Sequence, residues 1–203
     1  MTQICSDDNM LPLLSTLTPQ AALWLAVHDV DTSNADVARK LWKTAGGDVH
    51  TPEFIVAESL HLGAQGPEVR QACAASLGAA CGTDSALLAV LCAQITGAYA
   101  GGAIPPATRR AGCGLAIKVV APRLTDVDAV LDLMQFVLEK GLTDSSNEAR
   151  ECMLEGGTAL VDSHGASQLQ RMMPLIERYL ENDGSFTEDQ YDQVWPVHEY
   201  AQL

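Results

Sequence analysis

Three hexapeptides decide how this chain folds: Glu68-Val69-Arg70-Gln71-Ala72-Cys73, Thr108-Arg109-Arg110-Ala111-Gly112-Cys113 and Glu148-Ala149-Arg150-Glu151-Cys152-Met153. The arginine at the third position of each recurs at a spacing of 40 residues. Each hexapeptide follows a turn that contains Gly, Pro or Asp, and each opens a stretch of small apolar residues. A fixed period of this size indicates a repeat architecture rather than a single globular core.

A period of about 40 residues with two helices per unit is typical of HEAT repeats. One helical hairpin cannot bury its own apolar face, whereas stacked hairpins bury a shared core between layers. Hydrophobic residues make up 47% of the chain, aromatic residues only 5%, and Ala and Leu outnumber the β-branched Val and Ile. Since Ala and Leu favour helix, the sequence predicts an all-α HEAT/armadillo-type solenoid of stacked antiparallel helix hairpins.

Turn and capping signals divide the chain further. We expect an N-terminal segment at residues 1–17, a repeat array at 18–182 and an acidic, frayed C-terminal end at 183–203. Thr18-Pro19, Thr51-Pro52, Asp84 and Thr125 are the expected helix starts, and Gly165 is expected to separate the last two helices. The predicted units are 18–47, 51–82, 84–122 and 125–164, with 166–182 as a half unit.

The repeated arginine is in an electrostatically unfavourable position, because a cation at a helix start opposes the helix macrodipole. We therefore expect a compensating bond from Arg70, Arg110 and Arg150 to a turn carboxylate or carbonyl of an adjacent unit, which forms a structural ladder. Arg109 is left as a possible contact for a partner.

The charge balance of 12 basic to 26 acidic residues, a net charge of −14, argues against a large basic face and against DNA binding. No apolar run has the length of about 20 residues that a membrane span needs, and the N-terminus lacks a signal peptide. These features predict a cytoplasmic protein that does not bind membranes, and six cysteines in the reduced state.

No catalytic, cofactor-binding or metal-binding residues are identified. The five histidines form no His-Glu-x-x-His motif and no Cys/His cluster with zinc spacing, and His28 and His164 are expected to cap carbonyls at helix ends. Cys73 and Cys113 are expected to be buried, and Gly156-Gly157 to mark a close helix–helix contact. The chain is therefore interpreted as a protein without enzymatic activity and without a cofactor.

Several stretches resemble one family. Arg110 to Ile117, Glu148 to Gly165 and Met172 to Asn182 are similar to repeats of the large general-control translational activators, and Leu23 to Asp29 resembles a preceding part of the same array. The resemblance covers about Thr18 to Val194. It implies a cytosolic HEAT-repeat scaffold with ribosomes and proteins as partners, which stimulates the initiation factor 2 alpha kinase during amino-acid starvation.

The resemblance also implies that this chain corresponds to a central piece of such an array, without the kinase-binding region. The family continues after Val194 with another repeat helix, where this sequence has Trp195-Pro196 and ends at Leu203, so we expect a fragment or a truncated gene model. Two alternatives stay open: a HEAT scaffold of another class, such as a transport or phosphatase scaffold, and a small helical enzyme.

Overall fold

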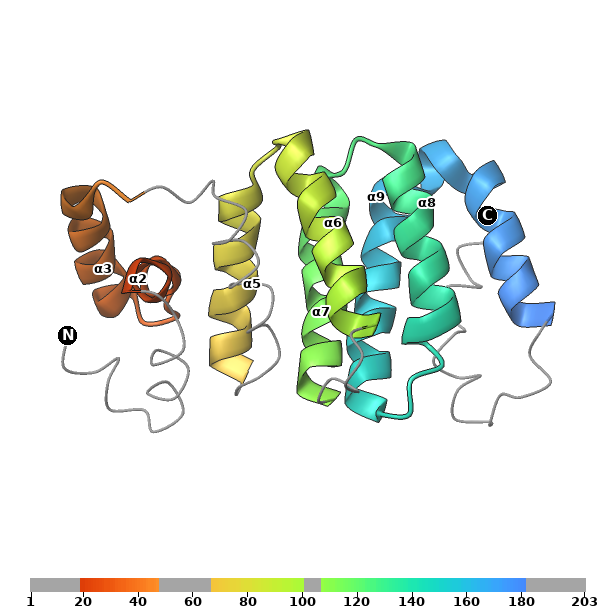
Figure 1. The fold of residues 1–203 in the computed structure, drawn as a ribbon, viewed down its shortest axis with the longest axis horizontal. Helices are drawn as coiled ribbons and strands as arrows, with labels where there is room; N and C mark the ends of the chain where they lie inside the picture. The colour runs from red at the N-terminus through yellow and green to blue at the C-terminus, as the bar shows by residue number, and fades with distance from the viewer. Residues whose placement is uncertain (1–18, 48–66, 101–106, 182–203) are drawn as a thin grey trace.

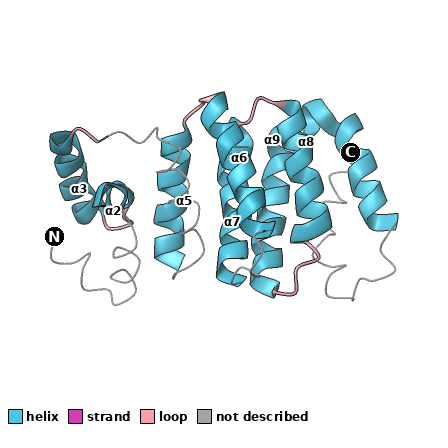
Figure 2. Ribbon diagram, viewed as in Figure 1, coloured by secondary structure: helices cyan, strands magenta, loops and turns pink. Residues whose placement is uncertain are grey.

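A computed structural model describes residues 19–47, 67–100 and 107–181 of this chain, and those residues fold into helices connected by short turns (Figures 1 and 2). The first two described helices form a hairpin, and the remaining helices follow it along the chain. The bounds are α2 Pro19–Val27, α3 Thr32–Ala45, α5 Pro67–Cys81, α6 Ser85–Ala100, α7 Ala107–Val120, η1 Ala121–Arg123, α8 Val127–Phe136, η2 Val137–Gly141 and α9 Asn147–Glu181.

The helices stack in two layers, as a solenoid does. In one layer α5, α7 and the first part of α9 lie side by side, and in the other α6 packs beside α8 (Figure 1). Each antiparallel pair, α6 with α7 and α8 with α9, joins the layers, and the α2–α3 hairpin packs on α5 through α2. The all-α solenoid predicted from the 40-residue period is confirmed. The predicted helix that starts at Thr51-Pro52 lies outside the described residues.

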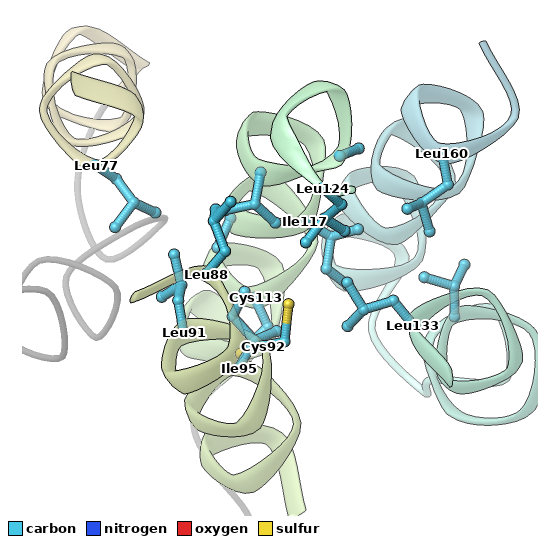
Figure 3. Close-up of a cluster of buried hydrophobic side chains, with 14 of the residues drawn as sticks. Leu77, Leu88, Leu91, Cys92, Ile95, Cys113, Ile117, Leu124, Leu133 and Leu160 are labelled. Atoms are coloured by element: carbon cyan, nitrogen blue, oxygen red, sulfur yellow. The ribbon is translucent and has the colours of Figure 1, made fainter. Parts of the chain in front are cut away.

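One continuous hydrophobic core runs through the stack. Leu77 of α5, Leu91 of α6, Ile117 of α7, Leu133 of α8 and Leu160 of α9 are all buried and converge between the layers (Figure 3). A second, much smaller cluster lies inside the first hairpin. Because every helix after the first hairpin contributes to the same core, the stack from α5 to α9 buries its apolar surface as one body.

Carboxylates cap several helices at the places where the sequence predicts helix starts. The Oδ1 of Asp84 accepts hydrogen bonds from the backbone N–H groups of Ala86, at 2.9 Å, and Leu87, at 3.2 Å. Asp126 caps α8 by accepting from the N–H of Asp128, so the predicted cap at Thr125 is wrong by one residue. Such a side-chain acceptor satisfies N–H groups that have no partner within the helix.

The last helix turns back on itself. Near its start, Met153 packs against Gly141, while near its end Arg178 forms an ion pair with Glu139, only two residues away from Gly141. A straight helix would separate residues 153 and 178 by about 37 Å, so α9 bends strongly, as Figure 1 shows where it returns beside α8. The helix break predicted at Gly165 is thus replaced by a continuous helix whose axis changes direction.

Glycine backbones bring α7 and α9 into direct contact. A Cβ atom on Gly114 would lie 2.5 Å from the carbonyl oxygen of Cys152, and one on Gly156 would lie 2.8 Å from the carbonyl oxygen of Gly114. A Cβ on Gly157 would lie 3.0 Å from Cγ1 of Val137. The close helix contact predicted at Gly156-Gly157 is confirmed, and it fixes α7 against α9 with little room for adjustment.

Candidate interaction surface

The repeated arginines lead to a buried polar cluster around Asp144, in the turn before α9. Nε of Arg110 lies 2.5 Å from Oδ2 of Asp144 and its Nη2 lies 3.0 Å from Oδ1, a two-pronged ion pair. The two side chains are only 11% and 3% exposed. Tyr99 of α6 donates its hydroxyl to the same carboxylate, and Arg150 donates from Nη1 to the backbone carbonyl of Asp144 at 2.6 Å. The cluster, termed here the Asp144 node, ties α6, α7 and α9 to one turn.

The electrostatics of the Asp144 node favour the ionised acid. Burial alone would raise the pKa of Asp144, but the hydrogen bonds from Arg110, Tyr99 and the N–H of Ser146 outweigh it and hold that pKa below its ordinary value. The pKa of Tyr99 is raised, first by burial and then by the adjacent carboxylate, so its hydroxyl remains a donor. This arrangement holds a fixed charge pair inside the stack.

Two of the predicted ladder residues, Arg110 and Arg150, make different contacts in the structure. Arg110 reaches a carboxylate on the turn that follows it in the stack, whereas Arg150 bonds the turn that precedes its own helix, together with Asn147. The side chain of Arg70 lies outside the described residues. Arg110 and Arg150 therefore meet at the Asp144 node, and a ladder that continues through Arg70 stays a prediction.

Among the exposed cations of the described residues, two places bear on partner binding; Lys118, Arg171 and Arg178 are also exposed, but each is paired with an acid. Arg109, the residue predicted to contact a partner, is exposed at the start of α7. Sequence reasoning missed a second group on α3, where Arg39, Lys40 and Lys43 are all exposed. Arg39 pairs with Asp36 at 2.6 Å. With three basic residues and one acidic residue, α3 is locally positive in a chain of net charge −14, and a short-window charge count would have found it.

An open groove of about 780 Å³ lies over α5, α7 and α9, in the layer that contains the repeated arginines. Small and apolar groups line it together with charged side chains. The apolar and small lining residues are Ala74, Ala75, Gly78, Leu115, Val119, Pro122 and Cys152, and the charged ones are Lys118, Arg123, Glu148, Glu151 and Glu155. Nothing in the sequence analysis pointed to this groove.

The histidine predictions have different outcomes. Nε2 of His164 lies 2.8 Å from the carbonyl oxygen of Ala121, just after the end of α7, so the predicted bond to a carbonyl is present. The predicted position in a turn is wrong, because His164 lies within the continuous helix α9. The prediction for His28 is wrong, because its ring packs edge-on against Trp24 at a centroid distance of 4.6 Å. This contact joins two residues at the C-terminal end of α2, and Nε2 of His28 makes no hydrogen bond to a carbonyl there.

The cysteines are structural. Cys73, Cys81, Cys92, Cys113 and Cys152 are buried free thiols, as expected for Cys73 and Cys113, and Cys5 lies outside the described residues. Burial raises the pKa of the Cys81 and Cys92 thiols to about 11 and that of Cys113 to about 12. Thiols with such pKa values are poor nucleophiles at neutral pH.

Metal sites and membrane spans were considered for the described residues only. Within them, no group of three or more His, Cys, Asp or Glu side chains is arranged to hold a metal ion. None of the described helices has the length and apolar character of a membrane span. What the described surface offers is an exposed cation at the start of α7, a basic α3 and a groove, all suited to macromolecular contacts.

Comparison with known proteins agrees with the architecture. The family model described as "Stalled ribosome sensor GCN1, HEAT repeats" matches residues 13–195. Protein ILITYHIA of Arabidopsis thaliana is 29% identical over 184 residues, which are 85% of this chain and 6% of that protein. No solved structure matches the chain.

Two mammalian proteins named stalled ribosome sensor GCN1 are also similar. The human protein is 32% identical over 79 residues, 38% of this chain and 3% of that protein, and the mouse protein is 26% identical over 171 residues, 75% and 6% respectively. The matched part of this chain thus corresponds to no more than 6% of the length of these relatives.

Proposed function

Because this chain belongs to the GCN1 HEAT-repeat family, we propose that it is a non-enzymatic scaffold segment that contacts ribosomes in the regulation of translation. The observation that carries the proposal is the family match over residues 13–195 of a chain whose described part is a HEAT-type stack. The relatives named stalled ribosome sensors support the ribosome as the partner. The family resemblance of the sequence adds the finer part of the proposal: the chain acts in the cytoplasm, as one segment of a longer scaffold that stimulates the initiation factor 2 alpha kinase through other segments.

The distribution of charge on the described surface supports a ribosome contact that is confined to a few exposed cations. A chain of net charge −14 is repelled by RNA over most of its surface, so any ribosomal contact has to use the few places where cations are exposed. Arg109 at the start of α7 and the three cations of α3 are such places. The Asp144 node holds Arg110 inward, which leaves the neighbouring Arg109 as the accessible member of the pair.

The alternative of a HEAT scaffold of another class predicts no ribosome binding. Co-sedimentation of the purified chain with ribosomes across a salt series separates the two. We expect binding at low salt that weakens as salt rises, because contacts with phosphate release counterions. Absence of co-sedimentation at low salt would contradict the proposal.

A matched pair of variants tests the contact itself. Arg109→Glu is expected to weaken binding and to reduce the salt slope by about 1, the loss of one phosphate contact. Arg171→Glu makes the same charge change on the other layer of the stack, where Arg171 pairs with Asp128, and is expected to leave binding unchanged. Equal weakening by both variants would show that only net charge matters and that Arg109 is not a contact.

A further inference from the structure

Large apolar side chains are exposed on the α2–α3 hairpin. Val30, Val37 and Leu41 are three of the four large hydrophobic residues that the described ranges expose, and the fourth, Leu169, lies on α9. Val37 and Leu41 are 45% and 43% exposed and are spaced by four residues, so they lie next to each other on one face of α3. Isolated exposed apolar residues are ordinary on a protein surface, whereas a pair on one helix face offers a contact area.

The opposite face of α3 attaches the helix to the molecule. Ala35 and Ala38 are buried, and Trp42 is half-buried inside the hairpin. α3 lies at the end of the described stack, where it packs on α2 (Figure 1). Because the attached face is the one with the alanines, the face with Val37 and Leu41 is left without a described element that covers it.

Two lysines without a counter-charge lie beside this apolar pair. Lys40 borders the pair, and Lys43, three residues later, lies next to Lys40 on the helix surface. Both lysines are exposed, and neither forms an ion pair with a described residue. Arg39, by contrast, is held by Asp36 at 2.6 Å. The second half of α3 therefore presents two available positive charges next to exposed apolar surface.

The acids of the hairpin lie at the other end of α3. Asp31 caps the helix by accepting hydrogen bonds from the backbone N–H groups of Ser33, at 2.8 Å, and Asn34, at 3.4 Å. Asp29 accepts from the N–H of Asp31 at 2.8 Å and from the side-chain amide of Asn34 at 3.4 Å. Charge thus changes sign along α3, from carboxylates in the turn before it to lysines in its second half. A ligand that covers the apolar pair meets positive charge from Lys40 onward.

We propose that this face of α3 docks an acidic amphipathic helix of a partner protein. Apolar side chains of that helix, spaced by three or four residues, cover Val37 and Leu41, and its carboxylates lie against Lys40 and Lys43. The proposal rests on the proposed scaffold function and specifies the chemistry of one partner. Because the contact is one short helix face, the docked helix stays clear of the acidic remainder of a chain with net charge −14.

RNA, a membrane and a second copy of this chain complement the face less well. Phosphates do not cover apolar side chains, and unpaired bases stack on aromatic rings, whereas Trp24 and Trp42 of the hairpin pack against each other. Recognition of anionic lipid takes a cluster of about four to eight cations, and two are available here. A symmetric contact between two copies of α3 sets lysine against lysine. This choice leaves Arg109 as the phosphate contact of the proposed function.

Fluorescence anisotropy of the full chain with labelled probes tests the proposal. The probes are a helical peptide of Glu, Ala and Leu with its leucines on one face, the same peptide with Lys in place of Glu, the same peptide with Gln in place of Leu, and a single-stranded RNA of similar length. We expect the acidic amphipathic peptide to bind more tightly than each of the other three. Equal or tighter binding of any of those three, or no binding of the acidic amphipathic peptide, would overturn the proposal.

Two double variants locate the binding on α3. Val37→Thr with Leu41→Gln removes the apolar pair without changing charge and is expected to weaken peptide binding about tenfold. Lys40→Gln with Lys43→Gln is expected to weaken it about fivefold, since two exposed ion pairs are lost. Sedimentation equilibrium of the chain alone tests the second copy: a dimer that is lost in Val37→Thr with Leu41→Gln would assign the face to self-association and overturn the proposal.

Matched controls make the same kinds of change outside α3. Leu169→Gln removes the exposed apolar residue of α9, and Lys118→Gln with Lys140→Gln removes two exposed lysines. Both controls are expected to leave peptide binding unchanged, and circular dichroism with thermal melting checks that each variant retains the fold. Weakening by a control equal to that of its α3 counterpart, or unchanged binding in either α3 variant, would overturn α3 as the site.

The outcome is separable from the proposed function. A chain that sediments with ribosomes but ignores the acidic amphipathic peptide loses only the α3 proposal. A chain that binds the peptide but not ribosomes loses only the ribosome contact.

Discussion

The α7–α9 pair and the α2–α3 hairpin show two different ways of attaching a helix to this stack. α7 meets α9 backbone to backbone at Gly114 and Gly156, and the Asp144 node fastens the same elements with charged hydrogen bonds. The α2–α3 hairpin is attached by side chains of α2, where Ala21 and Leu25 are buried in the core shared with α5 to α9. Trp24 packs against Trp42 within the hairpin, with ring centroids 5.1 Å apart and planes tilted by 46°, and it donates its indole N–H to the carbonyl of Ser76 in α5 at 3.2 Å.

The difference has a physical consequence. Backbone contact leaves no flexible atom to move, so the α7–α9 pair tolerates no added volume, whereas an aromatic bridge can reorient and repack. The hairpin also keeps Val37 and Leu41 of α3 about half exposed, at 45% and 43%, and its own buried cluster is small. We therefore expect the α7–α9 pair to form the rigid part of the molecule and the hairpin to open first.

Breaking the Asp144 node is expected to have the largest effect on the stability of the fold. Asp144→Ala is expected to lower the free energy of unfolding by about 3 kcal/mol, because it leaves the guanidinium of Arg110 buried without its counter-charge. Chemical denaturation monitored by circular dichroism measures the change. Asp162→Ala removes an exposed acid from α9 and is expected to stay within about 0.5 kcal/mol of wild type. Similar losses in both variants would show that the node does not stabilise the fold.

The same node makes stability depend on pH. The pKa of Asp144 is depressed in the folded chain, so its contribution is fully present above the ordinary aspartate value of about 3.9 and is lost as the pH falls through the folded pKa. Denaturation at a series of pH values in the acid range should show this loss in wild type. The acid-dependent loss should be smaller in Asp144→Ala, and an unchanged pH profile would contradict the depressed pKa.

A pair of glycine variants sharpens the packing comparison. Gly114→Ala places a methyl group 2.5 Å from the carbonyl oxygen of Cys152 and is expected to destabilise the fold by about 2 kcal/mol, because backbone cannot move aside. Gly97→Ala in α6 meets nothing within 4 Å and is expected to stabilise it by about 0.5 to 1 kcal/mol through helix propensity. Thermal melting of both variants gives the sign of each change. A change in melting temperature of the same sign in both variants would contradict the backbone contact between α7 and α9.

A smaller effect is expected at the hairpin. Trp24→Phe removes the indole donor but retains an aromatic ring, and it is expected to cost about 1 kcal/mol, the contribution of one hydrogen bond. Because this bond joins α2 to α5, the loss should appear as easier opening of residues 19–47 and not of α7. Limited proteolysis followed by mass spectrometry measures where cleavage increases. Increased cleavage within α7 would contradict the separation of the two regions.

Sequence reasoning predicted the described helices, the cap at Asp84 and the close contact at Gly156-Gly157, because periodicity, capping residues and paired glycines are local signals. It singled out Arg110 but not its partner Asp144, since the two are 34 residues apart and meet only when hairpins stack. The bend in α9 was predicted as a break, because a glycine after a polar pair marks the change of direction but does not reveal that helical bonding continues.

The groove could not be predicted at all. Its alanines and glutamates are common in any solvent-exposed helix, and only the spacing of three helices in the stack makes them a surface. The basic face of α3 was within reach, because Arg39, Lys40 and Lys43 lie close together in the sequence of an acidic chain.

Amide hydrogen exchange of the purified chain, alone and with ribosomes, tests whether a rigid α7–α9 frame presents a local contact for the ribosome. We expect the slowest exchange in α7 and the first part of α9, faster exchange in α2 and α3, and added protection at the start of α7 or in α3 when ribosomes are present. Exchange as slow in the α2–α3 hairpin as in α7, or no added protection in either place, would contradict it.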